Sequence, residues 1–419
     1  MPPPAATIYA LPTELIGVII KAWHILDPCA PEIAIQICRS WRSIALSMTA
    51  LWRVLTLTTQ KSSLVKVPLW NKRSCGHVEH LRLMSTVVPK GLSALGTALD
   101  DLNLGEISTL ECNLIEWVRH DVFKRITRLQ RFRVATIGYA VHLWWDIVSA
   151  MENLRMLDLV NAYPQDDRAL HLPNLRVVRF QSPEGAYLIR FLLKTCAGIP
   201  LEEATLSLKH SRDKAITQPS DRDLANMGSS RVDYSHLRYL RLSGTMDWHL
   251  LTARLFLPEL HTLIMDHFPS PSLTACFGDI RPLDARVRSL TVHTQDHLAI
   301  EEGLSILIQL EGVPTLQHLR ICGYLSDTFL DGLSDGCQPH LVHIDLSGCE
   351  GVSPAAVVRL AVGKIENGNP LRRITLNGCQ WVTEDLVSVL KDMGLVVDFE
   401  HGIVPLVPQG WRHWTFVNT

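Results

Sequence analysis

A short apolar motif recurs along most of the 419-residue chain and limits what the chain can fold into. The motif is an apolar residue, two others, an apolar residue, one other, and a third apolar residue. Start-to-start spacings between neighbouring clear copies run from 21 to 30 residues, except for two wider gaps after the Val78 and Leu175 copies. Weaker copies fill gaps at Leu99/Leu102/Leu104 and around Leu206/Leu208. The ten clear copies are Val78/Leu81/Leu83, Leu129/Phe132/Val134, Leu154/Leu157/Leu159, Leu175/Val178/Phe180, Leu237/Leu240/Leu242, Leu260/Leu263/Met265, Val287/Leu290/Val292, Leu316/Leu319/Ile321, Leu341/Ile344/Leu346 and Leu371/Ile374/Leu376.

The spacing inside the motif predicts a strand, because its last two apolar residues alternate with other residues and so point to one face. The stretch after the motif often has helical spacing, as at Val357, Leu360 and Ala361. Each unit is then one strand and one return helix, and stacked units share a continuous core. We therefore predict an α/β solenoid of about 12 strand–helix units.

Two copies extend the motif with a cysteine. They read Leu341-x-x-Ile344-x-Leu346-x-x-Cys349-x-x-Val352 and Leu371-x-x-Ile374-x-Leu376-x-x-Cys379-x-x-Val382. These copies resemble the leucine-rich repeat family in its cysteine-containing subtype, and the resemblance implies a leucine-rich repeat horseshoe. Because Cys349 and Cys379 hold the same place in successive turns, we predict that they are small buried side chains at the strand-to-helix bend. A metal or disulfide role is the alternative, although closely paired cysteines are absent from the sequence.

The first 60 residues follow a different pattern. They contain Leu11-Pro12 with Glu14-Leu15, Cys38-Arg39-x-Trp41-Arg42, Ile44-Ala45 and Leu51-Trp52. This order resembles the F-box over about Leu11 to Leu55. The resemblance implies a small all-helical module that binds a Skp-family adaptor, which in turn recruits a cullin-RING ligase. Carried over by position, the adaptor-facing residues are Leu11, Pro12, Leu15 and Ile19, while Trp41, Leu51 and Trp52 complete that surface or hold the helices together. Alternatively, all seven are core residues of a helical cap on the solenoid.

These patterns divide the chain into an F-box-like helical module at 1–60, a solenoid at 61–400 and an aromatic tail at 401–419. The period is interrupted at 211–235, where a charged segment predicts a solvated insertion loop or a docking loop. The tail contains Trp411, Trp414 and Phe416 and either caps the last repeat or folds back toward the concave face.

Composition excludes several classes of protein. Lys and Arg total 40 against 42 Asp and Glu, so no overall basic field favours nucleic acid. We find no apolar run of about 18 residues, which argues against a membrane span. Ten scattered cysteines and an N-terminus without a secretory pattern predict a reducing compartment, cytoplasmic or nuclear.

We find no catalytic constellation. Gly332-Leu333-Ser334-Asp335-Gly336 matches the nucleophile-elbow string, but it follows a helical pattern and predicts a helix end. The pairs His77/His80 and His293/His297 lack a third ligand nearby, so we expect surface histidines and no metal. The predicted protein has no cofactor and is not an enzyme.

The residues between the apolar strand positions face the concave side of such a solenoid. In the ten clear copies they include only two acids, Asp158 and Asp345, against seven arginines. The hypothesis is a surface for protein substrates, acidic or phosphorylated, since guanidinium groups pair with both anions. The alternative is a solvated face whose arginines are paired by acids elsewhere. The seven predicted substrate-binding residues are Arg82, Arg131, Arg133, Arg179, Arg241, Arg320 and Arg373.

The sequence as a whole predicts the substrate-recognition subunit of a Skp-cullin-F-box type ubiquitin ligase. Such a receptor supplies proximity and orientation and needs no catalytic group of its own. The alternative is a ligase-independent leucine-rich repeat scaffold that binds proteins.

Overall fold

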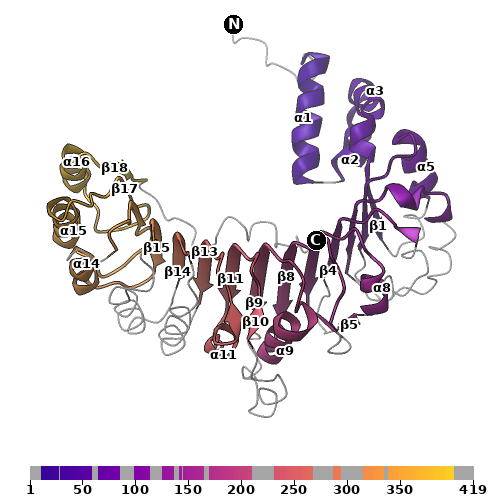
Figure 1. Ribbon diagram of the computed structural model, residues 1–419. Helices are drawn as coiled ribbons and strands as arrows, with labels where there is room; N and C mark the ends of the chain where they lie inside the picture. The colour runs from indigo at the N-terminus through magenta and orange to yellow at the C-terminus, as the bar shows by residue number, and fades with distance from the viewer. Residues whose placement is uncertain are drawn as a thin grey trace, which may run out of the picture. The chain divides into compact units, whose positions relative to one another are not determined.

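The computed structural model (Figure 1) describes residues 11–27, 29–58, 65–84, 99–113, 125–135, 141–143, 145–164, 169–209, 231–267, 286–293, 315–334 and 338–400. The chain separates into two compact units. Unit 1 comprises Met1–Asp166 and Leu170–Leu175, and unit 2 comprises Asp167–Ala169 and Arg176–Thr419. In the described part of the chain, no helix is long and apolar enough to cross a membrane.

The described strands form one long parallel sheet and two short two-stranded sheets. The order in the long sheet is β1-β2-β3-β4-β6-β8-β9-β11-β13-β14-β15-β16-β17-β18, which follows the chain turn by turn. This is the architecture of a leucine-rich repeat solenoid, and it confirms the predicted fold class. The two short sheets pair β5 with β7 and β10 with β12.

The elements of unit 1 begin with helices and continue as strands. They are α1 (Thr13–Leu26), α2 (Ala30–Ile37), α3 (Arg39–Ser47), η2 (Thr49–Trp52), β1 (Val54–Thr58), α5 (Lys66–Arg73), β2 (His80–Met84), η3 (Leu104–Glu106), β3 (Thr109–Cys112), β4 (Arg131–Ala135), β5 (Val141–Leu143), α8 (Trp145–Ser149), β6 (Met156–Val160) and β7 (Ala162–Pro164).

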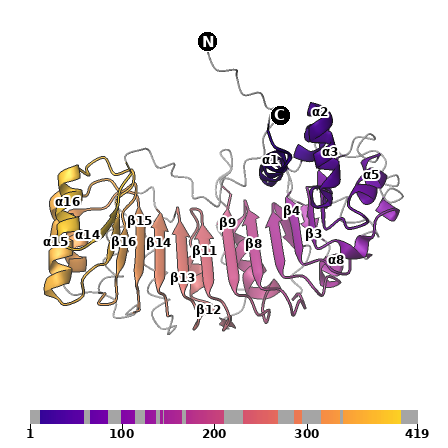
Figure 2. The same ribbon diagram turned by 90° about the horizontal axis from the view of Figure 1, so that it is seen from above.

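Unit 2 alternates strands with helices over its whole length. It contains β8 (Val177–Ser182), α9 (Gly185–Arg190), the π-helix η5 (Phe191–Thr195), β9 (Glu203–Leu208), β10 (Val232–Asp233), β11 (Tyr239–Ser243), α11 (His249–Thr252), β12 (Leu255–Phe256), β13 (Thr262–Asp266), β14 (Ser289–His293), β15 (His318–Cys322), α14 (Asp327–Ser334), β16 (His343–Asp345), α15 (Pro354–Glu366), β17 (Arg373–Thr375), α16 (Glu384–Asp392) and β18 (Val396–Asp398). Figure 2 shows α14, α15 and α16 beside the last strands.

The three N-terminal helices pack on one another around a small core. Ile16 and Ile20 of α1 are buried, as are Trp41 and Ala45 of α3. The module is joined to the first repeat through Trp52, which is fully buried and donates a hydrogen bond from Nε1 to the Ala45 carbonyl over 2.9 Å. A piece this small buries little surface alone and needs such a neighbour.

Side chains of α5, the first return helix, complete this joint. The guanidinium of Arg73 lies 4.3 Å from the centre of the Trp52 ring, and the Trp70 ring meets Trp52 edge-on at 4.9 Å. Lys66 forms an ion pair with Glu32 of α2 at 2.7 Å. Within unit 1 the helical module is therefore fixed to the first turn by aromatic and charged contacts.

All ten clear motif copies correspond to strands of the long sheet. Each apolar strand position is buried, and each fully buried leucine contributes roughly 2 kcal/mol to folding. The weaker copy around Leu206/Leu208 is confirmed as β9. The copy at Leu99/Leu102/Leu104 is wrong, because Leu104 begins the 3-10 helix η3 and the strand follows as β3, with Ile107, Leu110 and Cys112 as its buried set.

Cys349 and Cys379 are both buried at the bend after a strand, as predicted. The Cys349 thiol donates to the Ile321 carbonyl over 3.1 Å, and the Cys379 thiol donates to the Leu346 carbonyl over 3.0 Å. Each thiol therefore satisfies a carbonyl at the end of the preceding turn's strand. Both cysteines are free thiols.

The predicted interruption at 211–235 falls mostly outside the described residues. Its last residues are described: Val232–Asp233 form β10, which pairs in parallel with β12. Tyr234 is buried, and its hydroxyl donates to the Leu192 carbonyl in the π-helix. The tail at 401–419 lies outside the described residues.

Gly244 follows β11 at a point where two successive turns approach each other closely. Its φ is +111°, and a Cβ there would lie 2.6 Å from Leu208 Cβ and 2.9 Å from the Leu208 carbonyl oxygen. We expect Gly244→Ala to lower the free energy of unfolding by about 3 kcal/mol, as it adds a backbone clash to the strain of positive φ. Gly198, with φ +82° and nothing within 4 Å, is the control, and Gly198→Ala should cost about 1 kcal/mol. Equal losses in denaturant titrations would contradict the clash.

Candidate binding surfaces

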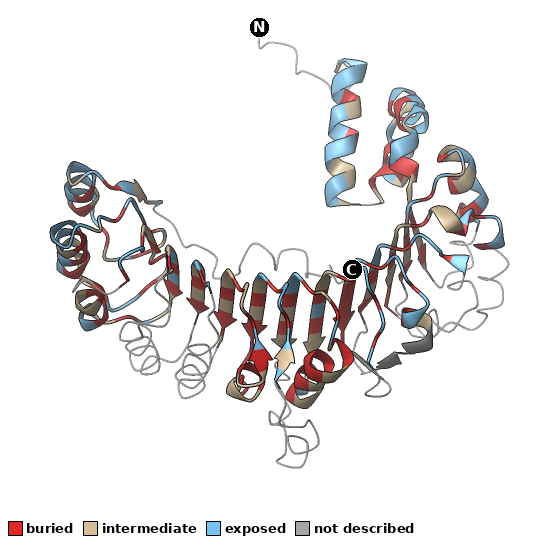
Figure 3. Cartoon of the chain, in the orientation of Figure 1, coloured by how far each residue is buried: buried red, intermediate tan, exposed pale blue. Residues whose placement is uncertain are grey.

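Helix α1 carries a continuous apolar stripe that faces solvent. Leu15, Val18, Ile19, Ala22, Ile25 and Leu26 recur at the spacing of one helix face and are all exposed. The fractions are 49% for Leu15, 61% for Val18, 83% for Ile25 and 86% for Leu26. Figure 3 shows α1 as mostly exposed, with buried residues confined to one side. The helix is thus apolar on two faces, and only the Ile16/Ile20 face is used by the module's core.

The seven predicted adaptor-facing residues divide between surface and core. Pro12, Leu15 and Ile19 are exposed and Leu11 is half-buried. Trp41, Leu51 and Trp52 are 3%, 2% and 0% exposed, so in this structure they hold the helices and the first turn together. Sequence reasoning missed Val18, Ile25 and Leu26, although their spacing from Leu15 was a readable signal.

The sheet has a second candidate surface, which we call the open face. It is formed by the strand residues that lie between the buried apolar positions. In unit 1 strict register aligns Thr56, Arg82, Glu111, Arg133 and Asp158 in one row across β1, β2, β3, β4 and β6. The last four residues of this row alternate in charge, and neighbouring strands place their side chains within reach of one another.

Five of the seven predicted arginines form ion pairs with an acid on the following strand. In unit 1, Nε of Arg82 lies 2.9 Å from Glu111 Oε2, and Nε of Arg133 lies 3.4 Å from Asp158 Oδ2. The corresponding pairs in unit 2 are Arg241–Asp266 at 2.6 Å, Arg320–Asp345 at 3.3 Å and Arg373–Asp398 at 2.5 Å. Arg131 and Arg179 are exposed on β4 and β8.

The charge of the open face is close to balanced in each unit. On the unit 2 strands of the long sheet, four arginines meet four acids, Glu203, Asp266, Asp345 and Asp398. Unit 1 has three arginines, Arg82, Arg131 and Arg133, and two acids, Glu111 and Asp158. The excess of arginine in the motif copies arose because Glu111, Glu203 and Asp398 lie on strands outside those copies, and Asp266 lies one residue beyond one. This pairing matches the alternative interpretation of the sequence, in which the face is solvated and acids elsewhere in the chain pair with its arginines.

Asp266 is the most buried member of these pairs. Its side chain is 2% exposed, and it lies 2.8 Å from His293 Nδ1 as well as 2.7 Å from Arg241 Nε. Burial raises the pKa of Asp266, but the contacts with His293 and Arg241 outweigh burial and hold it below its usual range. A carboxylate this buried needs both partners to remain charged.

Glu111 is held in a similar way in unit 1. It is 17% exposed, and His80 Nε2 lies 3.5 Å from its Oε1 while Arg82 contacts Oε2. Burial raises the pKa of Glu111, but His80, Arg82 and the charge of Arg133 outweigh it and lower the pKa to about 2. Glu111 thus links the charges of three adjacent strands.

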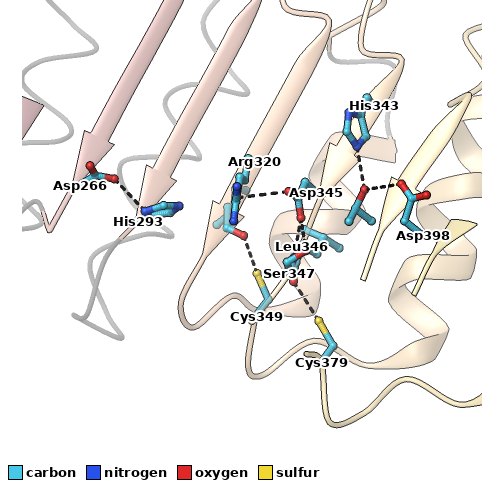
Figure 4. A network of polar contacts seen from close by, with 12 residues as sticks. Asp266, His293, Arg320, His343, Asp345, Leu346, Ser347, Cys349, Cys379 and Asp398 are labelled. Carbon is cyan, nitrogen blue, oxygen red and sulfur yellow. Dashed lines mark hydrogen bonds and ion pairs between the residues drawn. The ribbon is translucent and has the colours of Figure 1, made fainter. Parts of the chain in front are cut away.

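The last strands of unit 2 carry a polar network on the open face (Figure 4). His343 Nε2 lies 3.0 Å from Thr375 Oγ1, and that hydroxyl donates to Asp398 Oδ2 over 3.2 Å. The His318 ring stands edge-on to the His343 ring at 5.6 Å. These contacts connect β15, β16, β17 and β18.

The remaining candidate residues show no arrangement for chemistry. Ser334 is the last residue of α14, and its hydroxyl donates to the Asp331 carbonyl. Of its neighbours, Asp335 and Gly336 lie outside the described residues, as does His297. Among the residues that the structure describes, no group of three or more His, Cys, Asp or Glu side chains could hold a metal ion.

No protein-family model and no curated protein matches the chain. Rad7 in its yeast complex with Elc1 is similar over 97% of this chain and 98% of that chain, at 12% identity and a TM-score of 0.40. An internalin from Listeria monocytogenes is similar over 94% and 100%, at 11% identity and 0.33. A leucine-rich repeat protein from Bacteroides thetaiotaomicron is similar over 78% and 44%, at 13% identity and 0.29. At these identities the likeness concerns the fold alone.

The depressed pKa of Glu111 predicts a pH dependence of stability. A folded-state pKa of about 2 stabilises the fold above the ordinary glutamate pKa, and this contribution is lost as pH falls from about 4.5 through 2. We expect Glu111→Gln to lower the free energy of unfolding by about 2–3 kcal/mol at pH 7 and by less than half of that at pH 3.

The control for this measurement is Glu79, which pairs with Arg53 at 2.8 Å while both side chains are more than two-fifths exposed. Glu79→Gln should change stability by at most about 0.5 kcal/mol at either pH. A pH-independent loss in Glu111→Gln would show that the carboxylate charge is not what stabilises this row.

Proposed function

We propose that the chain is the substrate-recognition subunit of a Skp-cullin-F-box type ubiquitin ligase. In this proposal the exposed stripe of α1 binds a Skp-family adaptor, and the open face of the repeat sheet captures target proteins. The observation that carries the proposal is the stripe itself, because it is a large apolar surface on a small helical module.

The stripe exceeds what a structural cap requires. A cap needs one apolar face toward the solenoid, whereas α1 adds a second one. Of the 16 large apolar residues exposed in the described part of the chain, eight lie between Leu15 and Leu46. Exposed apolar surface gathered in one place favours a protein interface, since scattered single residues are the norm elsewhere. A stripe at helical spacing suits a groove in a partner protein.

The open face supplies the other half of the proposed receptor. Parallel strands present rows of side chains at fixed spacings, and target capture requires binding and orientation alone. The seven arginines remain the predicted target-binding residues, with acidic or phosphorylated segments as the predicted targets. The side chains of Arg320 and Arg373 are about half exposed although both form ion pairs, at 44% and 53%. These two guanidinium groups therefore keep an edge available to a second carboxylate.

A ligase-independent scaffold is the alternative function. It uses the same open face and assigns the α1 stripe to some other protein. Adaptor binding separates the two functions, because only the ligase subunit needs it.

We expect the double substitution Val18→Glu with Ile25→Glu to weaken binding of a purified Skp-family adaptor by at least about tenfold. Each substitution places a charge within the exposed apolar stripe and leaves the buried Ile16/Ile20 face intact. Titration calorimetry on the full chain measures the affinity, and an unchanged thermal midpoint shows that the fold is retained.

The matched control is Thr13→Glu, which adds the same carboxylate to α1 outside the stripe and should leave adaptor binding unchanged. Affinity purification then extends the test: the double variant should lose adaptor and cullin and keep its target proteins. Absence of adaptor binding by the native chain would refute the ligase function and leave the scaffold.

A further inference from the structure

Three basic side chains stand in one row across the C-terminal strands of unit 2. His318 on β15 is in register with His343 on β16, and His343 is in register with Arg373 on β17. Parallel neighbours lie about 4.8 Å apart, so the three Cα atoms span about 10 Å. We call these three residues the basic row. His318 and Arg373 are exposed and His343 is half-buried, so the row is accessible from the open face.

The adjacent row holds the acids that balance these charges. Arg320, Asp345, Thr375 and Asp398 follow one another in register on β15 to β18. With neutral histidines, Arg320 and Arg373 balance Asp345 and Asp398, and this part of the face has no net charge. With both histidines protonated it carries two positive charges.

We propose that the basic row is a docking site for an acidic protein segment and that it captures this segment more strongly at mildly acidic pH. The proposal rests on the proposed target-binding function of the open face and names the class of target. An acidic segment that crosses the strands would present carboxylates to His318, His343 and Arg373.

The contacts of His343 explain why proton uptake and binding are coupled. Burial lowers the pKa of His343. The charge of Asp345 on its own strand raises this pKa, whereas the charges of His318 on β15 and Arg373 on β17 lower it further. Asp398 on β18 raises it. These contacts therefore shift proton uptake by His343 to lower pH than for an ordinary histidine. A carboxylate arriving beside it favours the protonated form, so binding and protonation reinforce each other.

Neither register partner of His318 is an acid that would already neutralise its charge. Its register partner on β14 is Ser289, which is uncharged, and its partner on β16 is His343. The two rings meet edge to face, so protonation of both places like charges close together. That repulsion is relieved when an anion binds beside both rings.

The test uses the full-length chain and a fluorescent hexaglutamate peptide, with hexalysine as the peptide control, in anisotropy titrations at pH 7.5 and pH 6. We expect the native chain to bind hexaglutamate about fivefold more tightly at pH 6, the combined effect of two surface ion pairs. His318→Gln with His343→Gln should abolish this difference. Arg373→Gln should weaken binding at both pH values, because it removes a positive charge from the row.

The matched control is His236→Gln with His340→Gln, which removes two exposed histidines outside the row and should keep the fivefold difference. Thermal midpoints at both pH values check that each variant is folded. The proposal is overturned if the row variant keeps the same pH dependence, or if the native chain binds hexaglutamate at neither pH. Both outcomes are independent of adaptor binding, so they leave the ligase function to its own test.

Discussion

A shared register is the constraint from which the rest of the structure follows. Each strand must place its apolar residues at the same levels as its neighbours, because successive turns bury them in one core. Leu240, Leu263, Leu290, Leu319 and Ile344 continue one such level from β11 to β16. A slip of one residue would turn a strand's leucines to solvent and its arginines into the core. The rows on the open face are therefore set by the packing on the opposite face.

Burial then decides how the charges in these rows behave. Where the open face is well solvated, as at Arg373 and Asp398, an ion pair contributes little and is screened by salt. Asp266 is different, because its side chain is almost fully buried. A single ion-pair partner would not offset the free-energy cost of burying its charge. It has two, on the strands before and after it, and removal of either would leave a buried charge poorly compensated.

The sequence predicted the strands well and the surfaces less well, for physical reasons. A leucine motif reports burial on one face, so ten strands could be located from it. Strand β3 was misplaced because its buried set ends in Cys112 and a stronger leucine pattern precedes it at Leu99. Leucine and tryptophan spacing in the helical module could not distinguish surface from core, because burial of Trp41 and Trp52 depends on which neighbours cover them. The arginine excess shrank once the strands missed by the motif, and Asp266 just beyond one copy, contributed their acids.

The ion pairs between successive strands have a consequence for how such a chain can evolve. Repeat arrays grow and shrink by gaining or losing whole turns, which is simple when each turn is self-contained. Here the turn carrying β16 supplies the carboxylate for the arginine of the turn before it. Deleting that turn would remove Asp345 and set Arg320 opposite Thr375, so Arg320 would lose the acid that now neutralises it. The turns of this array are thus not equivalent, because some of them carry the acid that pairs with the arginine of the turn before.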